Sequence, residues 1–337
     1  METNHKHLNI VRQPVSNRTK IKRFVYFSKG TCIKNKDTIS RIEKLGIPPA
    51  YNNVVISNRP RHYLQAIGED NKGRKQYIYN DTFLEKRDEN KFTNLILFSK
   101  KIEMIRNNIN AKLRNNDNVH SKDKIIALVL YIVEHCNFRI GNEFYANKYK
   151  TYGTTTLQNK HLTLNGNKLH FKFVGKKGVV NECWIDNRHV VELMSKLMKD
   201  SKDYIFEYDD MDNKRQLITA NDVNEYLKTY DENLTVKMYR TWKANYIFLQ
   251  ELIKFYKNVD KKEVNRVDAK KNAMDILKKI AFMLHNTPEV SKKSYMNNGI
   301  LELYLRNPIK FYILLQQKKK QGIDKLLVEL LESQTNQ

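Results

Sequence analysis

The sequence is poor in cysteine, proline and glycine, and it has no long apolar run. Its cysteines are odd in number and lack the spacing of a metal site, so we expect a reducing compartment and no structural disulfide; they are Cys32, Cys136 and Cys183. No window approaches the roughly eighteen uninterrupted apolar residues of a membrane-spanning helix. The opening METNHKHLNIVRQ also lacks the apolar segment of a secretory signal. We therefore expect an intracellular protein without a membrane partner.

Acidic residues are scarce relative to basic ones. Lysine and arginine number 61 against 37 aspartates and glutamates, so the formal net charge is +24. A positive field of this size favours a polyanion as the partner. The alternative is a basic but non-specific protein, such as a ribosomal or membrane-surface protein. A length of 337 residues and a hydrophobic content of 40% argue against it, because they favour a globular protein with a sizeable core.

Several familiar catalytic motifs are also missing. The sequence has no GxxxxGK[ST] phosphate loop, no HExxH, no CxxC and no GxSxG. Its histidines are too scattered to indicate a metal site, and we expect no bound metal. What remains as candidate chemistry is a set of basic residues that accompany a tyrosine.

The first part of the chain is predicted to be a small β-rich domain over residues 21–85. The runs FVYFSKG, NVVIS and RKQYIYN have the composition of strands and are separated by Gly, Pro and Asn. The polar residues 1–20 are expected to form a flexible N-terminus. The charged stretch 81–91 is predicted to be a linker or the first turns of a helix.

Residues 86–337 are predicted to form a larger, mainly helical domain. Ser121 is a candidate N-cap for the apolar helix KDKIIALVLYIVEHCNF, which Gly141 should end. A later helix should end near Asn286, because Pro288 cannot continue it and disfavours helix at the residue before it.

One stretch of this domain has a clear β pattern. In HLTLNGNKLHFKFVGKKGVVNECWI, the apolar residues Leu169, Phe171 and Phe173 alternate with the basic residues Lys168, His170 and Lys172. The stretch also contains two turn signals, Asn165–Gly166 and GKKG at 175–178. The pattern predicts a three-stranded antiparallel sheet. The predicted fold class is therefore α+β.

A tyrosine can attack a phosphodiester if its surroundings help. The phenol has an unperturbed pKa near ~10, so the phenolate needs assistance to form at neutral pH. Arginines and amide donors can bind the charge that develops on the non-bridging oxygens. A lysine can donate the proton that the leaving 5′ oxygen needs. With these cations built into the protein, the reaction does not strictly require a metal.

The chain contains candidates for these roles. They are Arg139 after a long apolar helix, Lys176 at a hairpin tip, Arg240 between aromatic residues in KMYRTW, and Tyr295 after a basic stretch. Taken singly, they are ordinary: an arginine at a helix end, a solvated lysine, a structural cation–π contact and a core or surface tyrosine. Only their combination indicates chemistry.

Taken in order, the motifs around these residues resemble a known family. FRIGNEFY (138–145), YGTTTLQNKH (152–161), FVGKKG (173–178), KMYRT (237–241) and NTPEVSKKSY (286–295) are similar to the catalytic domain of type IB DNA topoisomerases. The resemblance is to the small enzymes of poxviruses, bacteria and giant viruses. GRKQYIY (73–79) resembles their N-terminal DNA clamp domain. Each motif is weak alone, and the ordered series carries the resemblance.

The resemblance implies an enzyme that relaxes supercoiled DNA by cutting one strand transiently. Tyr295 would form a 3′-phosphotyrosyl bond, and Arg139 and Arg240 would bind the scissile phosphate. Lys176 would be the general acid, with Lys237 as a second proton donor. The free 5′ end would rotate and religate without ATP and without an essential divalent metal.

One position departs from part of the family. Poxvirus enzymes have histidine immediately before Thr-Pro, whereas this chain has Asn286, as bacterial members do, and His285 one residue earlier. Neighbours on a helix point about 100° apart, so both should not face the same phosphate oxygen. We assign the role to Asn286, a neutral amide donor, with His285 as the alternative.

The resemblance also implies contacts to double-stranded DNA outside the catalytic centre. The candidates are Lys75, Gln76, Tyr77, Tyr79 and Tyr145. Amide side chains such as that of Gln76 can read base edges, and Lys75 and Tyr145 would contact the backbone. Alternatively, Tyr77 and Tyr79 share a strand face with the core. Two domains joined by a linker suggest a monomer that clamps the duplex.

Two other functions stay open at this point. Tyrosine recombinases share the catalytic fold and chemistry, but they usually have histidine three residues before the second arginine, where this chain has Lys237. A non-catalytic DNA-binding protein is the third possibility, and the complete residue set argues against it. For a topoisomerase of this kind, the expected location is a viral factory, a virion or a bacterial cytoplasm.

Overall fold

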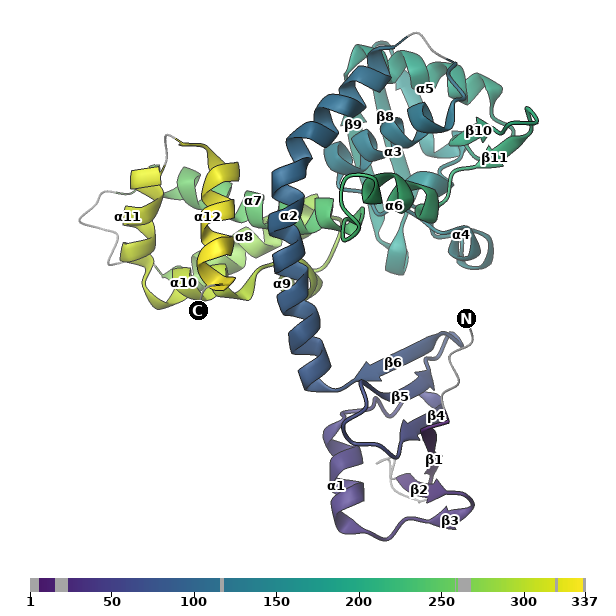
Figure 1. Cartoon of the computed structure of the whole chain (residues 1–337), viewed down its shortest axis with the longest axis vertical. Coiled ribbons are helices and arrows are strands. Elements are labelled where there is room, and N and C mark those ends of the chain that lie inside the picture. Colours follow the sequence, from purple (N-terminus) through teal and green to yellow (C-terminus); the bar gives the residue numbers. More distant parts are fainter. Residues whose placement is uncertain are drawn as a thin grey trace. The chain divides into compact units, whose positions relative to one another are not determined.

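The computed structural model describes residues 6–15, 24–115, 118–257, 259, 268–318 and 321–335. The chain divides into two compact units, Met1–Lys91 and Phe92–Gln337, and each is described by itself. The predicted α+β class is confirmed, because the first unit is built on a β-sheet and the second is mainly helical (Figure 1). In the described part of the chain, no helix is both long enough and apolar enough to cross a membrane.

The first unit contains a six-stranded antiparallel sheet. In spatial order its strands are β3 (Thr31–Cys32), β2 (Phe24–Ser28), β1 (Leu8–Pro14), β4 (Asn52–Ser57), β5 (Leu64–Glu69) and β6 (Lys75–Tyr79). Val54 and Ile56 alternate along β4, so their side chains point to the same face. They are buried there together with Ile42 of helix α1 (Lys36–Lys44).

The expectation that residues 1–20 are flexible is wrong for residues 8–14. These residues form β1, which pairs with β2 on one side and with β4 on the other. Ile10 is buried in the core. The polar composition concealed this strand because only alternate residues of a strand face the core. Residues 1–5 and 16–20 lie outside the described residues.

The second unit holds the remaining elements. Helix α2 (Asp81–Arg114) begins in the first unit, within the charged stretch for which a linker or helical turns were predicted, and it continues into the second. The other helices are α3 (Lys122–Cys136), α4 (Glu143–Tyr149), α5 (Arg188–Asp200), α6 (Ala220–Lys228), α7 (Lys237–Lys257), α8 (Ala269–Met283), α9 (Pro288–Tyr295), α10 (Asn298–Arg306), α11 (Pro308–Lys318) and α12 (Ile323–Thr335). The 3₁₀ turns are η1 (Thr154–Thr156), η2 (Asn159–His161) and η3 (Lys176–Gly178), and the strands are β7 (Leu162–Asn165), β8 (Lys168–Val174), β9 (Val180–Ile185), β10 (Glu207–Asp209) and β11 (Arg215–Leu217).

Helix α3 ends earlier than its sequence suggested. Asn137 adopts a left-handed conformation with φ 55°, so the helix stops at Cys136 and not near Gly141. The expectation of no structural disulfide is wrong, since Cys136 and Cys183 form a disulfide with Cα atoms 5.6 Å apart. These cysteines meet because α3 packs against β9, a contact that a count of cysteines cannot show. Cys32 is free and exposed, and the reducing compartment stays a prediction.

The predicted three-stranded antiparallel sheet is confirmed, in the order β7–β8–β9. Its apolar face packs into the core of the unit through Leu169, Phe171 and Phe173, which alternate along β8. Asn165 pairs with Lys168, so the turn residues are Gly166 and Asn167, one position later than predicted. Gly166 takes φ +57°, a left-handed conformation that glycine adopts without a steric penalty.

The chain between α8 and α9 brings two candidate residues into place. Helix α8 stops at Met283, three residues before the predicted end at Asn286. Thr287 is the N-cap of α9, and Pro288 occupies its first turn, where the missing N–H costs nothing. Tyr295 is the last residue of α9.

Candidate active site

The segment that carries Arg139 is held in place by the YGTTT stretch. The Thr154 amide donates to the carbonyl oxygen of Arg139 at 2.8 Å, and the Thr155 amide donates to that of Ile140 at 2.7 Å. Gly153 lies so close to this segment that a Cβ there would be 2.6 Å from the Arg139 carbonyl oxygen. The two sequence motifs therefore form one structural unit that fixes the backbone of Arg139.

Arg139 contacts Asn286 directly. Its half-buried guanidinium donates to Oδ1 of Asn286, and a second nitrogen is 3.4 Å from the carbonyl oxygen of His285. The Nδ2 atom of Asn286 is buried and has no hydrogen-bond partner among the described residues. The side-chain carbonyl of Asn286 thus accepts a hydrogen bond from Arg139, and the two N–H donors of the same amide are left without an acceptor.

His285 points elsewhere. Its Nε2 atom donates to the carbonyl oxygen of Cys136 at 3.2 Å, and its ring lies 5.4 Å from that of Phe138. Burial lowers the pKa of His285, and the positive charges of Arg240 and Arg139 lower it further. The hydrogen bond to the Cys136 carbonyl raises the pKa but does not outweigh these effects. His285 therefore serves the end of α3 as a neutral donor, while Asn286 is the residue that meets Arg139.

Arg240 is buried within α7 and joins three segments. Its guanidinium donates to the carbonyl oxygens of Asn137 and Leu284, the latter at 2.7 Å. Its Nε atom is 3.3 Å from the hydroxyl oxygen of Tyr295. Burial lowers the pKa of Arg240 to about 10, so the guanidinium stays charged at neutral pH. A fixed positive charge therefore lies beside the Tyr295 hydroxyl.

The surroundings of Tyr295 favour its phenolate. Only 6% of the residue is exposed, and this burial alone would raise the pKa of Tyr295. The charges of Arg240 and Arg139, the hydrogen bond from Arg240 and the charge of Lys237 outweigh burial and lower the pKa. A tyrosine with a lowered pKa between two arginines has the electrostatics of a nucleophile.

Asn245, which no sequence motif indicated, holds the backbone of Tyr295. Its Nδ2 atom donates to the carbonyl oxygens of Tyr295 at 2.9 Å and Thr241 at 2.8 Å, and its Oδ1 accepts from the Asn297 amide at 2.9 Å. The residue is completely buried. A polar residue inside the apolar stretch of α7 was the available signal, since a buried amide needs such partners.

The two candidate lysines are more accessible. Lys176 is the first residue of η3, at the tip between β8 and β9, and Lys237 is the first residue of α7; both are exposed. Burial of part of its side chain and the charge of Arg139 lower the pKa of Lys176, and Tyr295 acts against them. Lys176 is therefore within electrostatic reach of both Arg139 and Tyr295.

In the first unit, four of the candidate DNA contacts lie on β6. Tyr77 is 48% exposed, and the ring of Tyr79 lies 5.2 Å from that of Phe83. Ile78 packs on the core, so Tyr77 and Tyr79 do not share its face. Alternation along the strand places Gln76 on the same side as Ile78 and Lys75 on the side of the tyrosines, and Gln76 donates to Asp70 at 3.0 Å.

Tyr145 lies on α4 in the second unit and is 46% exposed. Its ring is 5.5 Å from that of Phe144 and 5.7 Å from that of Tyr149. Lys148 lies over the rings of Phe144 and Tyr149 at 5.4 and 5.5 Å. This short helix therefore presents a cluster of aromatic rings and one cation to solvent.

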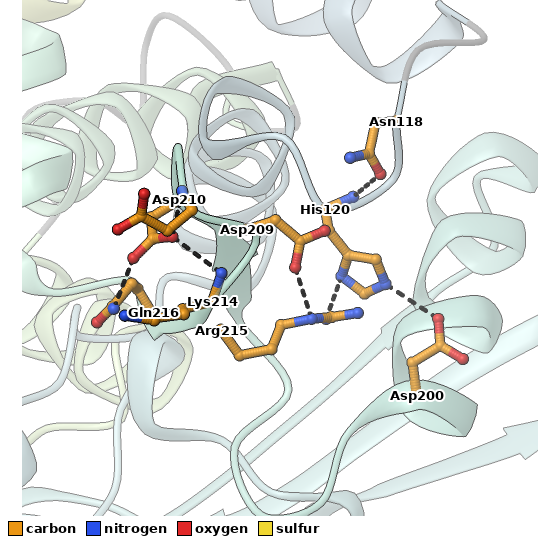
Figure 2. A network of polar contacts seen from close by, with 9 residues as sticks. Asn118, His120, Asp200, Asp209, Asp210, Lys214, Arg215 and Gln216 are labelled. Carbon is orange, nitrogen blue, oxygen red and sulfur yellow. Dashed lines mark hydrogen bonds and ion pairs between the residues drawn. The ribbon is translucent and has the colours of Figure 1, made fainter.

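A second network of charged residues proves to be structural. Figure 2 shows His120 between Asp200, 3.0 Å from its Nε2, and Arg215, 2.5 Å from its Nδ1. Arg215 also pairs with Asp209 at 2.7 Å. Both ring nitrogens are used, so His120 fixes the β10–β11 hairpin to the end of α5. In the segments that the structure describes, no group of three or more His, Cys, Asp or Glu residues could hold a metal ion.

Comparison with known proteins gives matches over both units. The family model for the catalytic core of eukaryotic DNA topoisomerase I matches residues 74–307, and the model for the N-terminal domain of bacterial DNA topoisomerase IB matches residues 23–70. DNA topoisomerase 1B of Acanthamoeba polyphaga mimivirus is 36% identical over 310 residues, which cover 90% of each chain. DNA topoisomerase I of monkeypox virus is 27% identical over 241 residues, covering 70% of this chain and 71% of the relative. The same figures hold for DNA topoisomerase 1B of vaccinia virus, strain Copenhagen.

Proposed function

We propose that this chain, which belongs to the type IB DNA topoisomerase family, relaxes supercoiled duplex DNA through a transient 3′-phosphotyrosyl bond on Tyr295. The protein is an isomerase, and DNA is its substrate. The observation that carries the proposed chemistry is the hydrogen bond from Arg240 to the Tyr295 hydroxyl, beside an Asn286 amide whose N–H donors are unused.

In the proposed cleavage step, Oη of Tyr295 attacks the scissile phosphorus. The bond from phosphorus to the 5′ oxygen breaks as the tyrosyl ester forms, and the phenol proton passes to solvent. Arg139, Arg240 and the Nδ2 donors of Asn286 bind the non-bridging oxygens, where negative charge develops in the transition state. Because Arg240 and Asn286 are held by other protein groups, little reorganisation is needed when the phosphate arrives.

The leaving 5′ oxygen receives a proton from Lys176 in this proposal. A lysine with a lowered pKa is a stronger acid than an ordinary lysine, so the transfer of its proton to the leaving oxygen is more favourable. Lys237, whose charge also acts on Tyr295, is a second candidate donor. Religation is the reverse of cleavage, with the 5′ hydroxyl attacking the phosphotyrosine.

The energy of the broken phosphodiester is kept in the ester with Tyr295, so the proposed cycle needs no ATP. The positive charge that the transition state requires comes from the two arginines and the lysine, so we propose that a divalent metal is not essential. We further propose that the enzyme acts as a monomer on duplex DNA. In the first unit, the surface formed by Lys75, Tyr77 and Tyr79 would contact the DNA, and Tyr145 would do so in the second.

Incubation with supercoiled plasmid in EDTA, without ATP, tests this function. Relaxation by the wild-type protein and none by Tyr295→Phe would support it. Site-specific strand exchange would indicate a tyrosine recombinase, and a mobility shift without relaxation would indicate a binding protein. Relaxation that requires added Mg²⁺ would contradict the proposal that the metal is not essential.

A further inference from the structure

The disulfide between Cys136 and Cys183 ends at backbone that supports the candidate active site. Cys136 is the last residue of α3, and its carbonyl oxygen accepts from Nε2 of His285 at 3.2 Å. The carbonyl oxygen of the next residue, Asn137, accepts from the guanidinium of Arg240. The disulfide is therefore attached directly to the segment that holds Arg240 and His285.

The same segment leads to Arg139. Only two residues separate Arg139 from Cys136, and one of them, Phe138, is fully buried. Arg139 in turn donates to Asn286. Because so little chain lies between them, a displacement at the end of α3 reaches this arginine.

The other end of the disulfide lies on β9. Cys183 pairs there with Phe171 of β8, and the tip between these strands carries Lys176. The two cysteines are 47 residues apart in the sequence. The bond thus fixes the distance between the end of α3 and the sheet.

Breaking the bond changes this distance. The sulfurs of a disulfide lie about 2 Å apart, whereas unbonded heavy atoms need about 3.5–4 Å. Cys136 is 3% exposed and belongs to the packed core, so its thiol has no free space to turn into. We therefore expect reduction to move the end of α3 away from β9 by a distance on the order of 1 Å.

Cys183 gives a reductant access to the bond, because its side chain is only half-buried. A thiolate of a dithiol attacks the sulfur of Cys183, the S–S bond breaks, and the sulfur of Cys136 leaves as a thiolate that takes up a proton. The second thiol of the dithiol then displaces Cys183. Two electrons and two protons pass to the protein, and the dithiol becomes a cyclic disulfide. A disulfide of low molecular mass reverses the exchange.

We propose that the bond between Cys136 and Cys183 is a redox switch, which holds Arg139 and Arg240 in position in the disulfide form and slows cleavage when it is reduced. This inference rests on the proposed function. A displacement of about 1 Å at groups that bind a transition state costs up to about 10²-fold in rate. A reducing compartment would keep the enzyme in its slower form, and oxidation by a disulfide would make it fully active.

Single-turnover cleavage by the wild-type protein, with and without dithiothreitol, tests the switch. Alkylation of the unfolded protein and mass spectrometry report the redox state, with Cys32 alone labelled in the disulfide form and all three cysteines labelled after reduction. Reduction should slow cleavage about 10- to 100-fold. The rate of Cys183→Ala should not respond to dithiothreitol, and the matched control Cys32→Ala should respond as the wild type does. DNA with sulfur at the 5′-bridging position should not relieve the slowing, because the displaced groups are the arginines and not Lys176.

Hydrogen exchange of the protein without DNA gives a second measurement. The amides of Thr154 and Thr155 donate to the carbonyl oxygens of Arg139 and Ile140, so they should exchange faster in the reduced protein. The amides of β4 and β5, in the first unit, should exchange at the same rate in both forms.

The outcomes separate the switch from the proposed function. Equal cleavage rates in the two redox forms would overturn the switch, and so would a normal response to dithiothreitol in Cys183→Ala. Rescue by the bridging sulfur would overturn it as well and would place the effect at Lys176. Three labelled cysteines in protein kept under oxidising conditions would show that the bond does not form. No cleavage in either form, with faster exchange at Thr154 and Thr155 after reduction, would overturn the proposed function and support the displacement of the Arg139 segment.

Discussion

The candidate active site has a buried half and an exposed half. Arg240 is 3% exposed and bonded to two backbone carbonyls, and it lies beside Tyr295, whose own carbonyl is held by Asn245. Lys176, in contrast, is exposed at a hairpin tip where Lys177 takes a left-handed φ of 65°. Packing thus positions Tyr295 and Arg240 before any DNA binds, whereas Lys176 is left on the surface. Variants of the buried half should change both stability and chemistry, and variants of the tip should change chemistry alone.

The largest effect is expected from Tyr295→Phe. This change removes only the attacking oxygen, so covalent DNA adducts should disappear while non-covalent DNA binding stays close to that of the wild type. The folded state loses only the hydrogen bond from Nε of Arg240 to the Tyr295 hydroxyl oxygen, which are 3.3 Å apart, so the fall in unfolding temperature should be small. Denaturing gels for the adduct and mobility shifts for binding make the comparison. A normal adduct yield would mean that another tyrosine is the nucleophile.

Lys176→Ala should slow cleavage by a factor of about 10²–10⁴, the usual contribution of a general acid. On DNA whose 5′-bridging oxygen is replaced by sulfur, most of this defect should vanish, because a thiolate leaves without a proton. The unfolding temperature should not change, because the residue lies at the exposed tip. Single-turnover rates on the two substrates decide the matter. An equal defect on both would exclude Lys176 as the acid, and Lys237→Ala would be tested next.

The pH dependence follows from the lowered pKa of Lys176. A general acid must be protonated, so cleavage of ordinary DNA should fall as pH rises through this pKa, at a lower pH than for an unperturbed lysine. The sulfur-containing substrate should not show this fall. Rates of the wild-type protein measured on both substrates across alkaline pH check the prediction, and parallel profiles would contradict it.

Arg240→Ala should reduce cleavage by about 10²–10³, the range for removing one donor to a developing oxyanion. The substitution also leaves the carbonyl oxygens of Asn137 and Leu284 without this donor. Each buried acceptor without a partner lowers the free energy of unfolding by about 1–3 kcal/mol. A loss of about 2 kcal/mol should lower the unfolding temperature by roughly 4–8 °C in a unit of this size. Arg240→Lys should restore only part of the rate, because the ammonium group of lysine cannot reproduce the planar set of N–H donors of the guanidinium. An unchanged unfolding temperature for Arg240→Ala would contradict the buried-half account.

The smallest of these effects concerns the two neighbours at the end of α8. Asn286→Ala should slow cleavage and religation together by about 10- to 100-fold, since both steps pass through one transition state. Asn286→His should keep substantial activity, because an imidazole N–H can occupy a similar place. His285→Ala should change the rates little, since its ring serves the Cys136 carbonyl. A large loss with His285→Ala and little with Asn286→Ala would reverse the assignment.

Local patterns predicted much of the fold. The alternation in β8 and the N-cap position of α3 are short-range signals, and both elements lie where these signals indicate. The break before Pro288 is also present, although α8 ends three residues earlier than predicted. The errors came from signals that were weak or long-range. β1 was missed because its composition is polar, and the end of α3 was placed too late because Asn137, not Gly141, takes the left-handed conformation that ends the helix.

The candidate site was only partly visible in the sequence. The ordered motifs indicated Arg139, Arg240, Asn286 and Tyr295, and the structure brings these residues together. The supporting contacts use backbone carbonyls and residues far apart in the chain, so no local spacing reveals them. The disulfide between Cys136 and Cys183 and the bond from Asn245 to the Tyr295 carbonyl are of this kind.

The covalent bond between protein and DNA can be mapped to a single residue. A DNA strand labelled on the 5′ side of the cut, in the part that would stay attached through its 3′ end, would be trapped on the wild-type protein, the complex digested with protease, and the modified peptide identified by mass spectrometry. We expect a single 3′-phosphotyrosyl link, at Tyr295. A link at any other tyrosine, or attachment through the 5′ end of the cut strand, would contradict it.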